Sequence, residues 1–321
     1  MKVIAVIVTY NRLALLKKSI NAVQEQTRKP DGIIVINNGS TDETEEWLKH
    51  QPVITHTQEN KGGAGGFSSG INLAYSHGAD WIWLMDDDTI ASKDALEKLL
   101  TALDRLEPNK DKVGFLSSTV LWTDGNLHAM NKTYVESNQT KAGVFRFASE
   151  ANFPIIKFGT FVSMLLSAKA VQKVGLPIKE FFIWADDAEY SLRIINNGMA
   201  GLAVKDSIVL HETPTNHQSN VLKDPQSAIW KYKYGLRNEL YAKRMHAGPI
   251  NFWISWTHRM FIMPFRILIN RKDHRWSFTK VIWQTSINAL SFRPKIEMAE
   301  GFREFSHEKT SHKPGAIKRI A

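Results

Sequence analysis

Short apolar runs alternate with amphipathic segments along the first 90 residues of the chain. The apolar runs lie at residues 3–9, 33–36, 53–57 and 81–85, and residues 13–26 between the first two carry apolar side chains at helical spacing. Strand and helix repeats of this length are typical of βαβ units, in which parallel strands form a sheet covered by helices. The pattern therefore predicts an α/β fold that begins as a doubly wound nucleotide-binding half.

The pattern is less regular between residue 100 and residue 224. Residues 123–152 are polar and mixed, which indicates loops or an antiparallel excursion. Strands are expected at residues 112–120, 159–166 and 201–210. Helices are expected at residues 41–49, 67–77, 168–174 and 190–197, with stop signals such as Gly175 and Gly198 after the last two.

Three consecutive aspartates, Asp86, Asp87 and Asp88, follow the apolar run at residues 81–85. Three neighbouring carboxylates cannot all be buried and ionised without a cation. Ligands bind at the carboxyl ends of strands in an open α/β sheet, and carboxylates there suit a hard divalent ion that also holds phosphate oxygens. The alternative is a solvated acidic turn before a helix that begins near Ser92. The position after a buried strand favours the cation site.

A glycine-rich run, residues 60–66 (NKGGAGG), precedes the helix expected at residues 67–77. It is not the dinucleotide-binding fingerprint, because that motif directly follows the first strand and this run follows the third. Glycine allows close backbone approach, and a helix N-terminus favours negative charge, so a sugar or a phosphate can lie against the run. A flexible connector explains the glycines equally well.

A second acidic pair, Asp186 and Asp187, follows the large apolar residues at positions 181–184. Adjacent carboxyl groups in partly apolar surroundings repel each other, so the pKa of one of them is expected to rise. Such a carboxylate can serve as a general base toward a sugar hydroxyl, and Trp184 can stack on a sugar ring. A helix N-terminal cap is the competing interpretation of the pair. His211, at the end of an expected strand, is either a neutral imidazole metal ligand or an ordinary packed residue.

The amino-acid composition excludes several kinds of site and segment. The chain has no cysteine, which excludes disulfides, a thiol nucleophile and cysteine-ligated metals, and is compatible with the cytoplasm. The N-terminus becomes polar too soon for a signal peptide, and no apolar stretch reaches the roughly 18 to 20 residues of a membrane span. With 43% hydrophobic residues in 321, the chain can bury one sizeable core plus an appendage.

The positive charge is concentrated in the C-terminal part of the chain. Residues 223–321 contain 19 Lys and Arg against 7 Asp and Glu, a net charge of +12, whereas the preceding residues have a net charge of −3. This distribution argues against a nucleic-acid-binding core and for an appendage that meets an anionic surface. Pro225 marks the predicted boundary between an α/β domain, residues 1–224, and a helical, basic, aromatic-rich region, residues 225–321.

Five motifs, taken in order, resemble the inverting nucleotide-sugar glycosyltransferases of family two, and the resemblance covers residues 1–245. Their GT-A fold is a Rossmann-like, mostly parallel sheet flanked by helices. The motifs are residues 8–12 (VTYNR), 38–42 (NGSTD), 86–88 (DDD), 184–187 (WADD) and His211. Three further motifs resemble the branch that contains galactofuranosyltransferases and proteins often labelled rhamnosyltransferases. They are residues 60–67 (NKGGAGGF), 184–190 (WADDAEY) and 232–238 (YKYGLRN).

The resemblance implies a role for each matching residue. Asp86 and Asp88 would hold Mn²⁺ or Mg²⁺ on the diphosphate of a nucleotide sugar, with His211 as the third protein ligand. Asp187 would be the catalytic base, with Asp186 beside it. The residues expected to bind the nucleotide sugar are Thr9, Tyr10, Arg12, Asn37, Asn38, Asn60, Gly62, Gly63, Gly65, Gly66, Phe67, Asp87, Trp184 and Arg237, the last against phosphate or acceptor.

One position departs from the family pattern. Relatives usually carry an acid that contacts the nucleotide base where this chain has Asn37, although an amide can still hydrogen-bond uracil. The resemblance at residues 62–67 implies UDP-galactofuranose as the donor, with dTDP-rhamnose as the alternative. The implied acceptor is a glycan or a lipid-linked glycan in cell-surface polysaccharide synthesis.

The implied reaction is a single displacement that inverts the anomeric configuration and needs no enzyme nucleophile. Two other classes of protein stay open. A sugar-phosphate nucleotidyltransferase shares the α/β start and the acidic metal site, but it would need a basic, glycine-rich triphosphate loop that residues 8–12 lack. A non-catalytic carbohydrate- or lipid-binding scaffold would have no use for Asp86, Asp88, Asp187 and His211 together.

Aromatic and basic residues are interleaved between residues 249 and 295. On helices, this composition favours a surface that lies on an anionic membrane. We therefore expect residues 246–321 to dock the protein peripherally on the cytoplasmic face of the cell membrane; a helical domain packed on the body or in a homo-oligomer is the alternative. The residues are Phe252, Trp253, Trp256, Phe261, Phe265, Trp276, Phe278 and Trp283, with Arg259, Arg266, Arg271, Lys272, Arg275 and Lys280.

Overall fold

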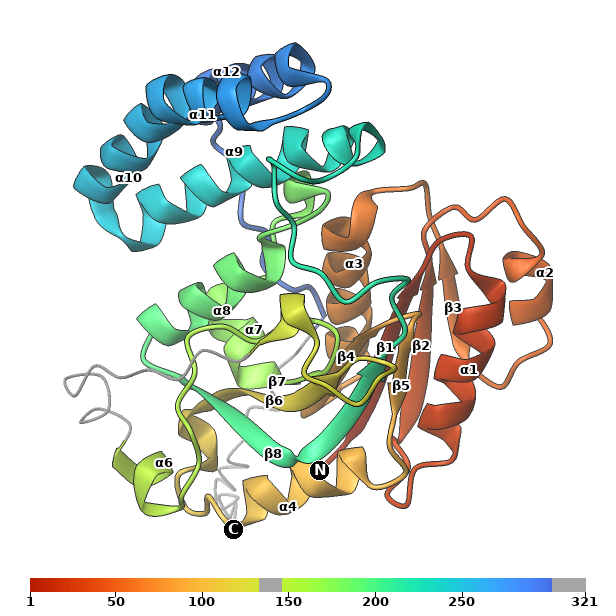
Figure 1. Cartoon of the computed structure of the whole chain (residues 1–321). Coiled ribbons are helices and arrows are strands. Elements are labelled where there is room, and N and C mark those ends of the chain that lie inside the picture. The colour runs from red at the N-terminus through yellow and green to blue at the C-terminus, as the bar shows by residue number, and fades with distance from the viewer. Residues whose placement is uncertain (133–145, 302–321) are drawn as a thin grey trace, which may run out of the picture.

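The computed structural model of the chain describes residues 1–132 and 146–301 (Figure 1). At its centre is an eight-stranded sheet with the strand order β3-β2-β1-β4-β7-β6-β8-β5. Four of the seven neighbouring strand pairs are parallel. The strands are β1 (Val3–Thr9), β2 (Gly32–Asn37), β3 (Ile54–Thr57), β4 (Trp81–Asp86), β5 (Thr89–Ala91), β6 (Val113–Leu121), β7 (Met164–Ser167) and β8 (Ala200–His211).

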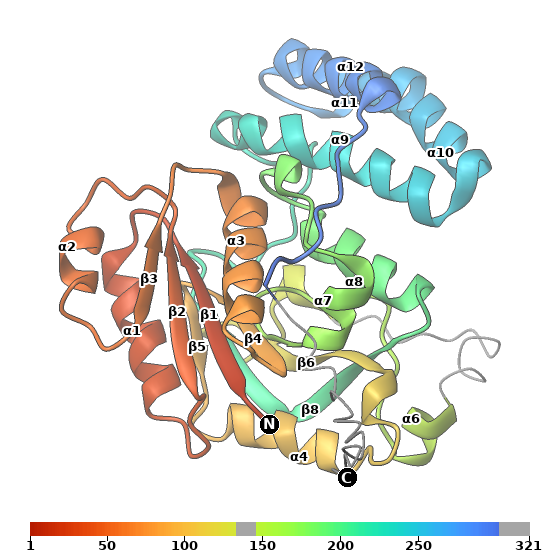
Figure 2. The same ribbon diagram turned by 180° about the vertical axis from the view of Figure 1, so that it is seen from behind.

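The first half of the sheet is parallel, as the alternating sequence pattern predicts. β1 pairs with β2 and β4, and β2 pairs with β3. All seven residues of β1 are buried, which is why its sequence is apolar throughout. The connecting helices are α1 (Leu13–Gln24), α2 (Thr44–Leu48) and α3 (Gly62–Ser76), of which α3 packs against β1, β2 and β4 (Figure 2).

The glycine-rich run belongs to helix α3 and is not a loop in front of it. The expectation that the helix begins near residue 67 is therefore wrong, because α3 already begins at Gly62. A Cβ atom at Gly66 would lie 2.4 Å from the Cγ1 atom of Val8 on β1. Glycine thus lets the first turns of α3 lie directly on β1, and this packing offsets the low helix propensity of the run.

The second half of the sheet is mixed and curls back toward the first. β7 is antiparallel to β4 and β6, and β6 is parallel to β8. β5 follows β4 after only two residues, yet it pairs with β8 in antiparallel register, with Thr89 opposite His211. The curl therefore brings the end of β8 beside the turn between β4 and β5, where the three aspartates lie.

Several element bounds differ from those that the sequence predicts. The strand expected at residues 159–166 is only Met164–Ser167, because Gly159 exchanges backbone hydrogen bonds with the Ser191 hydroxyl on α8 instead of with a strand. α8 (Asp186–Asn196) begins four residues earlier than expected. α2 is shorter than the helix expected at residues 41–49. The loops or antiparallel excursion expected at residues 123–152 are described only in part, because residues 133–145 lie outside the described residues.

The remaining helices of the body are α4 (Ala95–Asp104), α6 (Arg146–Glu150) and α7 (Ala168–Val174). α7 has the bounds that the sequence predicts.

A helical extension follows the sheet, as expected. Figure 1 shows α9 over α3 and α8, with α10 to α12 on its far side. The extension has its own cluster of buried residues, which includes Tyr232, Ile267 and Phe278. In the described ranges, no helix combines the length and the apolar character that a membrane crossing requires. The helices are α9 (Ile229–His246), α10 (Gly248–Thr257), α11 (Met263–Asn270) and α12 (Arg275–Ser291), with a π-helical turn at His258–Ile262 between α10 and α11.

The chain returns from the extension to the body after α12 (Figure 2). The Leu176 N–H donates to the Glu297 carbonyl at 2.8 Å, and the Glu300 N–H donates to Asn72 Oδ1 at 2.9 Å. The segment after α12 is therefore attached to the body by hydrogen bonds.

Candidate active site

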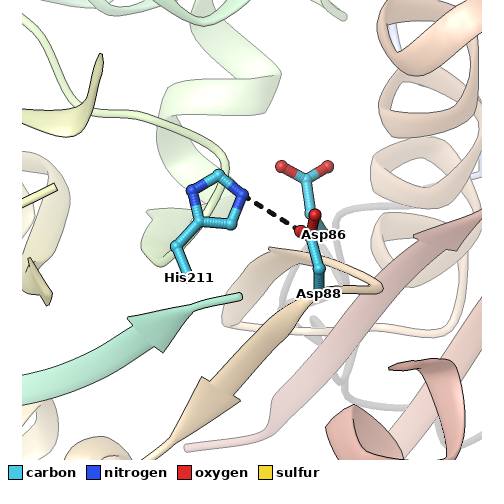
Figure 3. A group of neighbouring side chains, drawn as sticks. All are labelled: Asp86, Asp88 and His211. Atoms are coloured by element: carbon cyan, nitrogen blue, oxygen red, sulfur yellow. Dashed lines mark ion pairs between the residues drawn. The ribbon is translucent and has the colours of Figure 1, made fainter. Parts of the chain in front are cut away.

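The expected metal ligands come together at one place in the structure. β4 ends at Asp86 and β8 ends at His211, and the curl of the sheet brings these ends together with Asp88 (Figure 3). Each of the three side chains offers one ligand atom, and these atoms lie within 4.8 Å of one another. Residues that are far apart in the sequence thus form a compact set of one imidazole and two carboxylates.

This set has the chemistry of a divalent cation site. The Oδ1 atom of Asp88 is buried, and His211 Nε2 lies 3.0 Å from it. When His211 is neutral with its proton on Nδ1, Nε2 cannot donate, so this oxygen has no hydrogen bond from any described residue, and coordination of a cation would remove the resulting cost. Carboxylates suit Mg²⁺ and Mn²⁺, and a neutral imidazole is a common metal ligand. The donor set therefore fits either ion.

The acidic turn is electrostatically crowded. Burial, together with the Asp88 carboxylate, raises the pKa of Asp86 to about 7. Burial also raises the pKa of Asp87 to about 6, against the opposing effect of Arg12. Burial works to raise the pKa of Asp88 too, but His211 and Arg12 outweigh it and hold that pKa below its usual range. Without a cation, the turn therefore cannot hold all its carboxylates ionised at neutral pH.

His211 is held by a set of neighbours that sequence reasoning missed. Its Nδ1 atom lies 2.9 Å from Asn131 Oδ1, and its ring centroid lies 4.5 Å from that of His128. The Thr213 hydroxyl donates to the Thr215 carbonyl at 3.1 Å, so it accepts from His128 Nε2 at 2.9 Å. Burial and His211 lower the pKa of His128 to about 4. The neutral His128 and the Asn131 amide thus orient the His211 ring.

Part of the expected nucleotide pocket lies directly beside the acidic turn. The Thr9 hydroxyl donates to Asp87 Oδ2 at 2.8 Å, and the Tyr10 backbone N–H donates to the same oxygen at 3.3 Å. Arg12 Nη1 lies 2.7 Å from Asp88 Oδ2 and 3.3 Å from Asp87 Oδ1. These contacts place one half-exposed guanidinium next to the candidate cation site, where it can meet a phosphate.

The asparagines of the expected pocket form the wall that leads to α3. The Asn38 side chain donates to the Gly62 carbonyl at 2.7 Å, and Asn60 Oδ1 accepts from the Gly62 N–H at 2.9 Å. Asn37 is buried, and its side chain accepts from the Ser40 N–H at 3.0 Å and donates to Thr57 Oγ1 at 3.3 Å. The Asn37 amide is thus already engaged with protein groups.

The remaining expected pocket residues are distributed over α3 and α9. Gly63, Gly65 and Gly66 lie in the first turns of α3, whereas Phe67 is buried against Phe161 at a centroid distance of 4.7 Å. Arg237 lies on α9, where its Nη2 atom donates to the Glu180 carbonyl at 2.7 Å. Phe67 and Arg237 therefore make contacts within the protein, and their contact with a ligand stays a prediction.

Asp186 and Asp187 begin helix α8 after a strained segment. Phe182, Trp184 and Ala185 have φ values of 63°, 67° and 65°. Such values cost a non-glycine residue roughly 1 to 3 kcal/mol each and persist only where the surroundings enforce them. Ala185 occupies the N-cap position, so neither acid is the N-cap residue. Asp187 lies within the first turn, where its Oδ1 atom accepts from the Ala188 N–H at 2.7 Å.

The pKa values of both acids are raised. Loss of water contact and the neighbouring Asp187 raise the pKa of Asp186 well above its usual range, and the Asp86 carboxylate adds to this rise. Loss of water contact raises the pKa of Asp187 to about 6. A carboxylate with such a pKa is suited to accept a proton near neutral pH.

An aromatic surface lies next to the acidic pair. Trp184 is partly exposed and packs edge-on against Tyr232 with ring centroids 5.1 Å apart. Lys231 Nζ lies 5.9 Å from the centroid of the Trp184 ring, and the charge of Arg12 contributes to lowering the Lys231 pKa after the larger effect of burial. Lys231 and Tyr232 of α9 thus lie against the Trp184 ring, which directly precedes the acidic pair in the sequence.

Comparisons with known proteins agree with this geometry. The family model described as Glycosyl transferase family 2 matches residues 4–157, and the model described as Glycosyl transferase family group 2 matches residues 81–292. Galactofuranosyltransferase GlfT1 of Mycolicibacterium smegmatis is 29% identical over 236 residues, which cover 68% of this chain and 74% of that protein. Galactofuranosyltransferase GlfT1 of Mycobacterium tuberculosis is 28% identical over 260 residues, covering 75% and 80%.

Solved structures share the fold at low sequence identity. GalNAc-T7 with UDP, GalNAc and Mn²⁺ matches with a TM-score of 0.58 at 14% identity, covering 90% of this chain and 58% of that chain. S. aureus TarS 1–349 in complex with UDP-GlcNAc matches with a TM-score of 0.55 at 13% identity, covering 90% and 81%. The fold is GT-A, as expected. The chain belongs to glycosyltransferase family 2 and is a glycosyltransferase, and it is similar to the galactofuranosyltransferases named above.

Proposed function

We propose that the protein transfers galactofuranose from UDP-galactofuranose to a glycan or lipid-linked glycan of a cell-surface polysaccharide, in a metal-dependent and inverting reaction. The observation that carries this proposal is the cluster of Asp86, Asp88 and His211, with Asp186 and Asp187 as a second acidic pair at the start of α8. Metal-dependent inverting transfer uses a cation on the leaving diphosphate and a carboxylate as general base. The relatives named above, which are galactofuranosyltransferases, support this donor sugar.

The donor diphosphate would be bound by the acidic turn and its neighbours. Asp86, Asp88 and His211 would hold Mn²⁺ or Mg²⁺, which supplies charge neutralisation for the leaving diphosphate when bound. Arg12 would contact the phosphates from the other side, since half of its side chain is exposed beside Asp88. Because the Asn37 amide is engaged with Ser40 and Thr57, the preference for UDP rests on the relatives and not on this residue.

Asp187 would act as the general base of the transfer step. Its carboxylate accepts the proton of the acceptor hydroxyl while the hydroxyl oxygen forms a bond to the anomeric carbon. The bond between the anomeric carbon and the diphosphate oxygen breaks on the opposite face, and UDP leaves with the negative charge. Burial and the neighbouring Asp187 raise the pKa of Asp186, which disfavours a second negative charge there. Trp184 would supply the surface on which the acceptor sugar lies.

A panel of nucleotide sugars tests this function. The wild-type chain is incubated with Mn²⁺ and UDP-galactofuranose, UDP-galactose, UDP-GlcNAc, GDP-mannose or dTDP-rhamnose, and the released nucleoside diphosphate is measured. We expect release from UDP-galactofuranose above all others and its loss on chelation. Release from dTDP-rhamnose alone would identify the rhamnosyltransferase instead, and consumption of sugar phosphates with a nucleoside triphosphate would identify a nucleotidyltransferase.

We further propose that the C-terminal helices dock on an anionic membrane surface, where a lipid-linked acceptor would be reached. A row of large apolar side chains is exposed along α10, the π-helical turn and α11, at about helical spacing. An exposed apolar row of this size marks an interaction site. Arg266, Lys272, Arg275 and Lys280 are exposed on the same helices or beside them. The apolar residues are Ile250, Trp253, Ile254, Phe261, Ile262, Phe265 and Ile269.

Not all of the aromatic and basic residues that the sequence suggested for membrane contact are exposed in the structure. Phe252 and Phe278 are buried in the cores of the extension, so the interleaved aromatics do not all face outward. Arg259 is buried in contact with Leu236 and Glu239, and Arg271 donates to the Val221 carbonyl at 2.6 Å. These two arginines hold the helices together and are not available to lipid headgroups. The proposed boundary at residue 225 and the peripheral location at the inner membrane face are parts of this same proposal.

A further inference from the structure

The acidic pair is presented by a segment whose backbone conformation is enforced from outside. Three of the five residues from Phe181 to Ala185 are non-glycine residues with positive φ. The helix that follows begins directly at Asp186. The direction of the two carboxylates therefore depends on whatever keeps this segment in its strained conformation.

One buried side chain on α9 meets the segment at three points. The Nδ2 atom of Asn238 lies 2.9 Å from the Phe181 carbonyl oxygen, 3.1 Å from that of Ile183 and 3.0 Å from that of Trp184. The amide nitrogen donates two protons, which it shares among these three carbonyls.

The orientation of the Asn238 amide is fixed by its neighbour. Arg237 Nε and Nη2 donate to Asn238 Oδ1 at 3.1 Å and 2.9 Å. Because a guanidinium only donates, the atom that it contacts must be the oxygen, and the NH₂ group must face the segment. Arg237 also donates to the Glu180 carbonyl at 2.7 Å, directly in front of the segment.

The opposite side of the segment rests on the first turn of α3. The Phe182 carbonyl accepts from the Ala64 N–H at 3.2 Å. Gly62 has a φ of +69°, and a Cβ atom there would lie 2.0 Å from the same carbonyl oxygen. The Gly62 carbonyl in turn accepts from Asn38. The strained segment is thus held between the wall of the expected donor pocket and α9.

We propose that Asn238 is a positioning residue of the active site, which holds the segment Phe181–Ala185 so that Asp186 and Asp187 face the cation site. Helix α9 is therefore part of the catalytic machinery and not only the base of the C-terminal extension. This inference rests on the proposed function, because Asp187 matters to turnover only if it is the base.

Asn238→Asp tests the inference with an isosteric change. A carboxylate keeps the acceptor atoms that Arg237 contacts, but it cannot donate and would repel the three carbonyls. With UDP-galactofuranose and Mn²⁺, we expect kcat to fall by about 100-fold and UDP affinity, measured by calorimetry, to change by less than about threefold. Hydrogen exchange of the amides at residues 181–187 should accelerate by at least about tenfold. Asn251→Asp, an exposed change on α10 that adds the same charge, is the matched control.

A second variant covers the case in which Asn238→Asp does not fold. A Cβ atom at Gly235 would lie 2.6 Å from Trp184 Cε3, so Gly235→Ala presses on the Trp184 side chain of the same segment without touching the amide, and hydrogen exchange shows whether the backbone of the segment moves with it. We expect a similar loss of kcat with donor affinity retained, again with faster exchange at residues 181–187. All rates are divided by the fraction of molecules that bind UDP, so that a loss of folded protein is not counted as a loss of turnover.

Asp187→Asn, measured in parallel, separates this inference from the proposed function. If Asp187→Asn is inactive while Asn238→Asp and Gly235→Ala keep kcat within about threefold of wild type, Asn238 only stabilises the fold and the inference is overturned. If Asp187→Asn itself retains wild-type turnover, it is the assignment of the base that fails. Lost turnover in all three variants, with UDP still bound, supports both.

Discussion

The Nδ1 atom of His211 lies 2.9 Å from the Oδ1 atom of Asn131. An amide oxygen only accepts, so Nδ1 carries a proton and the Nε2 atom faces the carboxylates of Asp88 and Asp86. A neutral imidazole in this tautomer directs its free lone pair to the candidate cation site. Burial works to lower the pKa of His211, but these carboxylates outweigh it and raise that pKa, so a proton competes with a cation for Nε2 more strongly than at an ordinary imidazole.

Asn131→Ala should weaken cation binding without removing any ligand. Partners of this kind typically contribute about 10- to 100-fold to metal affinity. We therefore expect the Mn²⁺-dependent part of UDP affinity to fall by that factor in titration calorimetry. Asn21→Ala, an exposed change on α1, serves as the control. Equal Mn²⁺ dependence in wild type and Asn131→Ala would mean that His211 is not a ligand or needs no orientation.

Asp86→Ala and Asp88→Ala should each abolish transfer and weaken binding of UDP in the presence of Mn²⁺. Each change removes one of the two carboxylates of the cluster. His211→Ala should have a milder effect, because water can fill the vacated position. Asp104→Ala, which removes an exposed carboxylate on α4, should leave both properties unchanged. Wild-type Mn²⁺-dependent affinity in the two aspartate variants would remove the basis of the cation site.

Asp187→Asn should bind UDP normally and lose kcat by about 10²- to 10⁴-fold, the usual contribution of a general base. The base must be ionised, and its pKa is raised to about 6, so kcat of the wild type should fall as the pH falls through 6 and level off above it. This acidic limb should be absent from the residual activity of Asp187→Asn. An inactive Asp186→Asn beside a nearly active Asp187→Asn would reverse the two roles.

Phe261→Glu combined with Phe265→Glu should release the protein from anionic vesicles. The two side chains are 66% and 65% exposed, and burying one Phe in an apolar phase is worth about 1.5 to 3 kcal/mol. We expect binding of wild type in liposome co-sedimentation to require anionic lipid and to fall in high salt, and the double variant to bind at least about tenfold less. Leu127→Glu, at an exposed position of the body, is the control. Equal binding of wild type to neutral and anionic vesicles, or none to either, would favour a packing or oligomer surface.

Local sequence pattern predicted the parts of the fold that depend on local interactions. The buried strand β1 is a continuous apolar run, and α7 lies between a strand and Gly175, so both have clear signals at their ends. Asp86, Asp88 and His211 could be chosen because each directly follows or ends an apolar strand. The three side chains come together only because β5 pairs with β8. β5 is three residues long, and so short a strand carries no sequence pattern that predicts its partner.

The sequence pattern failed where tertiary packing decides the local structure. Glycines at residues 62–66 predict a loop by propensity, yet close packing on β1 makes them helical. The positive φ values of Phe182, Trp184 and Ala185 have no sequence signal, because Asn238 and the first turn of α3 impose them. Asn131 has no sequence signal, and Asn238 was noticed only as part of the motif at residues 232–238, because an asparagine that orients another group looks like any polar residue in the sequence.

UDP release from UDP-galactofuranose, measured for wild type and Asp88→Ala with and without Mn²⁺, tests the central claim most directly. Metal-dependent transfer from this donor predicts rapid release by wild type with Mn²⁺, almost none after chelation, and almost none by Asp88→Ala in either condition. Release by wild type that is unaffected by chelation, or undiminished release by Asp88→Ala, would contradict the claim.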